Sequence, residues 1–149
     1  MAGYVSRKAD GRMEVDLALI ADAATIDSSG KLSILGIFDR IGTASFPARH
    51  PHMVLILRFT VALNEAGMHE IGITLRDPVG NQVVGIDGEM QVGPGPAGDG
   101  GGIRVPHVLH LDGLVFPVPG QYAFDVRVDG QHLVSVPLTV YGPASSAMA

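Results

Sequence analysis

Cysteine and tryptophan are absent from this sequence of 149 residues, and positive charge is scarce. Without cysteine the chain cannot form a disulfide framework, a thiolate zinc site or a cysteine nucleophile. Ten basic residues against fifteen acidic ones leave a net charge of −5, which lacks the broad positive field that a phosphate backbone attracts. We therefore expect no nucleic-acid partner, and nothing in the composition indicates an oxidising compartment.

Long apolar runs are also missing. No window approaches the roughly 18 uncharged apolar residues of a membrane span, and residues 1–14 lack the apolar run of a signal peptide. We therefore expect a cytoplasmic protein that does not contact a membrane. Charged residues make up 17% of the chain, which is low for a globular protein and favours contacts between copies because repulsion is weak.

The length predicts one domain. We expect residues 1–14 to form a flexible N-terminal arm, residues 15–141 the domain, and residues 142–149 a disordered tail. Inside the domain, residues 93–102 contain glycine, proline and little else, and such a composition cannot bury apolar surface. This segment is therefore predicted to be a mobile loop.

Short segments in which apolar and polar residues alternate, separated by turn residues, predict strands. In the first segment the alternation places one set of apolar side chains on a single face: Val15, Leu17, Leu19 and Ala21. Near the end of the chain, Asp129-Gly130 predicts a tight hairpin turn, because both residues accept positive φ. About eight such segments predict an all-β fold, an antiparallel β-sandwich of the immunoglobulin-like or Greek-key type.

The segment from Pro119 to Phe124 favours a sandwich over a barrel. It resembles the corner of immunoglobulin-like and related folds, in which a tyrosine near the start of a strand bonds back to an adjacent loop. Here that tyrosine is Tyr122. We therefore expect its hydroxyl group to be buried and to have a backbone partner.

Further motifs occur throughout roughly residues 15–140. They are Ala21-Asp22-Ala23-Ala24, Asp27, the run from Gly30 to Ile41, Phe46-Pro47, His50-Pro51, Arg58-Phe59, and the run from Pro119 to Gly130. Together they resemble a widespread bacterial family of small β proteins that is classed as a domain of unknown function. The resemblance implies a single β-sandwich domain, and it implies no activity and no catalytic residue.

Histidines supply the first candidates for chemistry. In an extended chain His50 and His52 lie on one side of the strand, so both could reach a metal ion, with Asp112 or His110 as a third ligand. The alternative interpretation is that His50-Pro51-His52 simply enters the third strand. A small-ligand or metal-binding domain that uses its end loops, with His50, His52, Asp22 and Asp39 as candidates, is the alternative to the function proposed below.

Acidic residues supply weaker candidates. Asp22, Asp27 and Asp39 are similar to the carboxylates of calcium-binding sandwich modules, although Asp27 also begins a good turn. Glu70 and Glu89 have outward parity on neighbouring strands, as a glycosidase carboxylate pair would. The sequence contains neither a nucleophile elbow nor a phosphate-binding loop. We therefore predict that the protein is not an enzyme and needs no cofactor.

The alternation of apolar and polar residues fails in the earlier strands. Apolar residues there occupy the face that a monomeric sandwich exposes to water, where polar residues are expected. We therefore predict that a protein partner, either a second copy or a larger assembly, covers this face. The predicted interface residues are Leu35, Ile37, Val54, Ile56 and Arg58.

Two alternatives to a partner remain open at this point: residues 1–14 or the glycine-rich loop could fold over the face, or the apolar residues could be tolerated in water. If Ile56 does lie in an interface, its replacement by glutamate should disrupt association and leave the fold intact.

Overall fold

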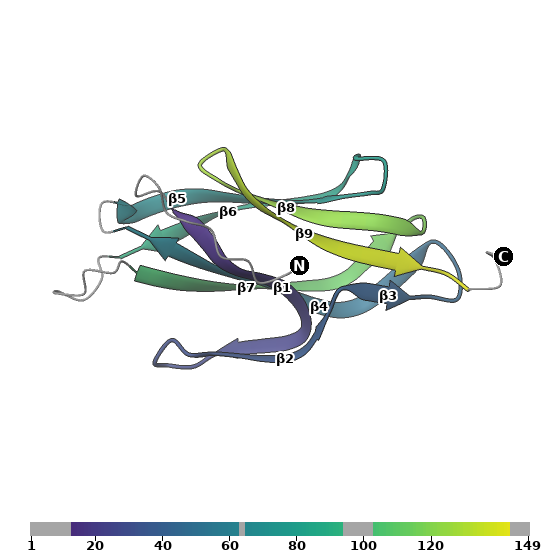
Figure 1. Cartoon of the computed structure of the whole chain (residues 1–149), viewed down its shortest axis with the longest axis horizontal. Helices are drawn as coiled ribbons and strands as arrows, with labels where there is room; N and C mark the ends of the chain where they lie inside the picture. The colour runs from purple at the N-terminus through teal and green to yellow at the C-terminus, as the bar shows by residue number, and fades with distance from the viewer. Residues whose placement is uncertain (1–12, 63–64, 94–102, 144–149) are drawn as a thin grey trace.

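The computed structural model describes residues 13–62, 65–93 and 103–143, and they form two sheets (Figure 1). One sheet has the order β2-β1-β4-β7 and contains β1 (Glu14–Ile26), β2 (Leu32–Phe38), β4 (Ala48–Val61) and β7 (Ile103–Phe116). The other has the order β3-β9-β8-β5-β6 and contains β3 (Arg40–Gly42), β5 (Gly67–Arg76), β6 (Gln82–Val92), β8 (Gly120–Val128) and β9 (Gln131–Tyr141). The predicted β-sandwich is confirmed.

The described strands run from Glu14 in β1 to Tyr141 in β9. Met13 is buried and Glu14 begins β1, so both belong to the domain rather than to the predicted arm. Residues 1–12, 94–102 and 144–149 lie outside the described residues, and with them most of the predicted arm, loop and tail. None of the described residues forms a helix that is long and apolar enough to cross a membrane.

The main core lies between the two sheets. Alternate residues of β4 point into it, and they are fully buried: Met53, Leu55, Leu57, Phe59 and Val61. From the opposite sheet, alternate residues of β8 meet them: Tyr122, Phe124, Val126 and Val128. This two-residue period on both sides explains why the later strands could be predicted from the sequence.

The predicted tyrosine corner is confirmed. The Tyr122 hydroxyl donates a hydrogen bond to the Val118 carbonyl at 2.7 Å and accepts one from the Val118 N–H at 3.2 Å. Its ring is fully buried and meets the ring of Phe116 edge to face, with centroids 5.0 Å apart. The hydroxyl group is thus satisfied without water, which allows a tyrosine to occupy the core.

The first strand departs from its predicted pattern. The register between β1 and β4 shifts between Val15 and Leu17, which marks a β-bulge. A bulge adds one residue to one strand and so reverses which face the following side chains occupy. Val15 therefore shares the main core with Ile20, while Leu19 lies on the other face of the sheet. The prediction that Val15 shares a face with Leu17, Leu19 and Ala21 was therefore wrong for Val15.

One short strand was not predicted at all. β3 has three residues and pairs in parallel with the end of β9, so the chain changes sheets between Phe38 and Arg40. Three residues carry too little alternation to identify a strand. Apart from this pair, every strand pair recorded among the described residues is antiparallel.

The β1–β2 hairpin does not continue in the plane of its sheet. β1 curves strongly, and Figure 1 shows its second half and β2 lying beneath the rest of the four-stranded sheet. We call residues 22–38 the folded hairpin. Its side chains Leu32 and Ile34 pack in a second apolar cluster with Val54 and Ile56 of β4. A third apolar layer, made by the chain itself, therefore covers part of the sheet's outer face.

Gly36 lies at the bend of the folded hairpin. Its φ is +74°, and the pairing between β1 and β2 is interrupted between Asp22 and Gly36. A Cβ atom at this position would lie 2.3 Å from an Asp22 carboxylate oxygen. Both the backbone angle and the close approach therefore require glycine.

Candidate binding surface

The predicted interface residues divide into three groups in the structure. Val54 and Ile56 are fully buried within one chain, so they offer no surface to a partner. The folded hairpin covers them, whereas the sequence had suggested a partner, the arm or the glycine-rich loop. Leu35 and Ile37 are 71% and 61% exposed, although they belong to the same hairpin. Of the four apolar residues predicted for the interface, only the two on β2 are therefore bare.

Arg58, the fifth predicted interface residue, belongs to an ion-pair network within the chain. Its Nε lies 2.9 Å from one Asp16 oxygen, and the Nε of Arg104 lies 3.0 Å from the other. Burial acts to raise the pKa of Asp16, but the hydrogen bonds from the two guanidinium groups outweigh it and lower that pKa. Asp16 of β1 thus links β4 and β7, and Arg58 is already partnered.

β2 is one of the two edges of its sheet, so its backbone groups on one side have no strand partner. Natural edge strands usually carry charges or proline, or are very short, which prevents unwanted pairing. Among the described edges, β7 contains Arg104 and Pro106, β6 contains Asp87 and Glu89, and β3 has only three residues. β2, from Leu32 to Phe38, has neither a charge nor a proline. It is therefore the least protected of the described edges.

A pocket of about 360 Å³ lies at the bend of the folded hairpin. Ile37 lines it, together with Asp22, Arg40 and His50. The structure thus brings together two of the residues considered for a ligand or metal site, Asp22 and His50, while Asp39 does not line this pocket. A second depression of about 190 Å³ shares Ile41, Gly42 and His50 with it. The exposed end of β2 therefore borders a hollow rather than a flat face.

The two histidines considered as metal ligands, His50 and His52, have different neighbours in the structure. The His50 ring lies 5.9 Å from that of Phe38, whereas His52 contacts the Asp112 carboxylate and stacks on His110 with centroids 5.6 Å apart. Asp112 and His110 are the residues considered as third ligands, and both do lie beside His52. Within the described ranges, no group of three or more histidine, cysteine or acidic residues is arranged to hold a metal ion.

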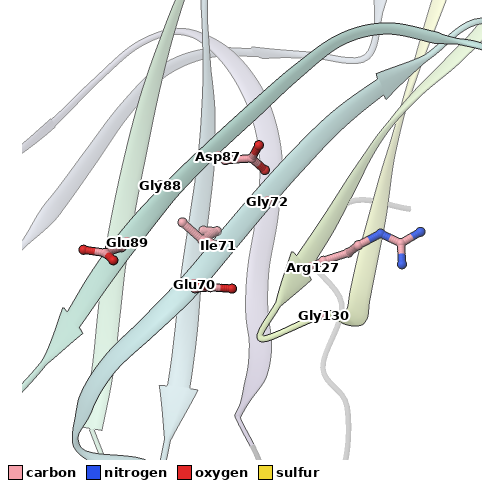
Figure 2. Close-up of a pocket in the computed structure, with 8 residues that line it drawn as sticks. All are labelled: Glu70, Ile71, Gly72, Asp87, Gly88, Glu89, Arg127 and Gly130. Carbon is pink, nitrogen blue, oxygen red and sulfur yellow. The ribbon is translucent and has the colours of Figure 1, made fainter.

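A groove of about 510 Å³ lies over β5, β6 and β8 (Figure 2). Gly72 and Gly88 line the groove, and no side chain fills it at these two positions. Glu70 pairs directly with Glu89 across β5 and β6, as their parity predicted. Both carboxylates are exposed, and Figure 2 shows the Arg127 side chain pointing away from them. The two residues considered as a carboxylate pair thus lie side by side on an open face of the sheet.

His69 fastens β5 to the turn between β8 and β9. Its Nδ1 lies 2.6 Å from an Asp129 oxygen and its Nε2 lies 2.5 Å from the Glu65 carbonyl oxygen. Because both partners are acceptors, both ring nitrogens must donate, which requires the protonated ring. The Asp129 hydrogen bond, followed by that to Glu65, raises the pKa of His69, and His69 lowers the pKa of Asp129.

We therefore expect His69→Ala to cost more stability at low pH than at high pH. A raised pKa in the folded state stabilises the fold fully below the unfolded value of about 6.5, and this contribution is lost as pH rises through the folded pKa. Because solvent reaches Asp129, the difference should be about 1 kcal/mol or less. Urea denaturation of both proteins near pH 5.5 and near pH 9 measures it. An equal cost at the two pH values would contradict this role.

The protein is a β-sandwich with an exposed apolar edge strand and hollows on its surface. The chain belongs to DUF6941, a family of unknown function, whose model matches residues 16–141. This confirms the resemblance to an uncharacterised family. A search of curated proteins finds no match.

Two solved structures are similar to the chain at low identity. One is the alkylpurine DNA glycosylase AlkC of Pseudomonas fluorescens bound to DNA containing an abasic site analogue, with 11% identity and a TM-score of 0.46. The match covers 89% of this chain but only 31% of the glycosylase chain. The other is an immunoglobulin-like protein of Pseudomonas aeruginosa, with 12% identity, a TM-score of 0.42, and coverage of 89% of this chain and 99% of that one.

Proposed function

We propose that this chain is a non-enzymatic binding module that associates with a protein partner through β2, at the edge of the folded hairpin. The observation that carries this proposal is the exposure of Leu35 and Ile37 on an edge strand without charge or proline. A partner strand added to such an edge gains main-chain hydrogen bonds, and the exposed side chains add apolar burial. No catalytic step is part of the proposal.

The apolar surface that a partner could bury is larger on β2 than on β4, where the sequence also predicted an interface. Full burial of a leucine or isoleucine side chain contributes roughly 1.5–3 kcal/mol, so Leu35 and Ile37 together can supply a useful part of an association energy. Val54 and Ile56 supply none, because their apolar surface is already buried in the isolated chain. The binding surface is thus displaced from the centre of the sheet to its edge.

The first test is the oligomeric state in solution. We expect sedimentation velocity to show self-association that increases with concentration, and Leu35→Glu to weaken it by about a hundredfold, because a symmetric pair loses the leucine twice. Val79→Glu is the control, since Val79 is 80% exposed in the turn between β5 and β6. Equal weakening by both substitutions would contradict a specific role for β2.

A partner other than a second copy is tested in the cells that make the protein. A photoreactive amino acid at position 35 should then crosslink to one defined protein, and the same group at position 79 should not. If the pure chain stays monomeric up to about 1 mM and position 35 also captures nothing, the proposed function is wrong.

A further inference from the structure

Residues of opposite charge lie at the two ends of β2. Resting on the proposed function, we infer that β2 pairs in antiparallel fashion with β2 of a second copy, about a twofold axis at Leu35. This pairing would join the folded hairpins of the two copies edge to edge. Such a contact uses the same patch on both copies and closes on itself, as most soluble dimers do.

Charge complementarity selects this axis. Lys31 and Asp39 flank β2, and each lies four residues from Leu35. Lys31 and Asp39 lie just beyond the two ends of β2, so an antiparallel pairing centred on Leu35 brings Lys31 of each copy to the end of the pairing where Asp39 of the other lies. Both side chains are exposed, and neither forms an ion pair with any described residue. Two exposed pairs of opposite charge add little to the affinity of the dimer, but they favour one register of the two β2 strands over others.

Other arrangements lose this complementarity. Moving the axis by one residue sets Lys31 opposite either Ile37 or Ile41, and it leaves Asp39 opposite a serine. A parallel pairing in register sets Lys31 opposite Lys31, and like charges directly opposite one another are destabilising. Pairing β2 with the other edge of the sheet, β7, would bring it against Pro106 and would produce an open fibre rather than a closed dimer.

The geometry at the axis can be tested because the chain contains no cysteine. Residues directly opposite one another in antiparallel strands have Cα atoms about 4.5–5.5 Å apart, which lies within the range that a disulfide spans. Leu35→Cys should therefore form a covalent dimer in mild oxidant at near-quantitative yield. Ile37→Cys is the matched control: its two copies would be about 13 Å apart and should stay unlinked.

Charge reversal tests the register independently. Lys31→Glu and Asp39→Lys should each weaken the dimer by about tenfold, because two attractive contacts become repulsive. The double variant exchanges the two charges and should return the dissociation constant to within about threefold of the unaltered chain. Sedimentation equilibrium measures all three, and circular dichroism checks that each variant is folded.

The outcomes separate this inference from the proposed function. Disulfide formation at position 35 but not at position 37, with recovery in the double variant, supports the twofold axis at Leu35. If Leu35→Glu disrupts association but Leu35→Cys does not crosslink, or Ile37→Cys crosslinks as well, then β2 binds and the axis is wrong. A chain that stays monomeric in all experiments overturns the inference, whether or not position 35 captures another protein.

Discussion

Ile56→Glu is expected to leave the protein unfolded at 25 °C. Ile56 is fully buried in the second apolar cluster, directly opposite Leu19 in the register of β1 and β4. A carboxylate at this position would be buried among the apolar side chains of that cluster. Burying an unpaired charge costs at least about 4–5 kcal/mol, which is comparable to the whole stability of many domains.

This expectation differs from the one that the sequence suggested, in which the same change disrupted an interface and spared the fold. Ile56→Val keeps the apolar character and should cost only about 0.5–1.5 kcal/mol in urea denaturation followed by circular dichroism. Val79→Glu controls for the added charge and should be close to neutral. A folded Ile56→Glu within about 1 kcal/mol of the unaltered chain would show that the folded hairpin does not cover β4.

Gly36→Ala is expected to have the second large effect, a destabilisation of about 2–4 kcal/mol. A positive φ costs a residue with a side chain about 1–2 kcal/mol, and the new Cβ atom would also lie 2.3 Å from the Asp22 carboxylate. Asp22 must then move, and the bend that brings Leu32 and Ile34 over the sheet is disturbed. Thermal or urea denaturation measures the loss.

Gly30 offers a matched control for Gly36. It also has a positive φ, +87°, but nothing lies within 4 Å of the Cβ position. Gly30→Ala should therefore show the backbone cost alone. Asp22→Ala combined with Gly36→Ala should recover the part that is due to the clash. Equal effects of the two single glycine substitutions would contradict a specific role for Gly36 in the bend.

The later strands could be predicted from the sequence because each has one face toward the core and one toward water, which gives a two-residue period. In β8, and in β9 from Ser135 onward, every second residue is buried, and the Asp129-Gly130 turn between the strands does have positive φ at both residues. The corner at Tyr122 follows from a local motif whose hydrogen bond reaches only four residues back. Local rules suffice where one face meets the core and the other meets water.

The earlier strands depart from those rules for reasons that are not local. A bulge at the start of β1 reverses its faces, and the alternation of apolar residues cannot locate a bulge beforehand. Apolar residues on both faces of β4 did indicate that something covers the outer face. They could not indicate what covers it, because that depends on a bend at Gly36, many residues away in the sequence.

The candidate binding surface was likewise predicted in part. The alternation places Leu35 and Ile37 on one side of β2 and Val54 and Ile56 on one side of β4. It predicts the same exposure for all four residues. In the structure the first two residues are exposed and the last two are the surface that the hairpin covers. An extended hairpin and a folded one have the same alternation, so the sequence pattern could not separate these pairs.

The central claim, that the free edge of β2 is where this chain associates, is tested most directly by amide hydrogen exchange of the unaltered protein at low and high concentration. We predict that exchange slows in the segment from Leu32 to Phe38 as concentration rises, and that the edges of β6 and β7 do not change. Slowing at another edge, or none at β2 while the protein demonstrably associates, would contradict the claim.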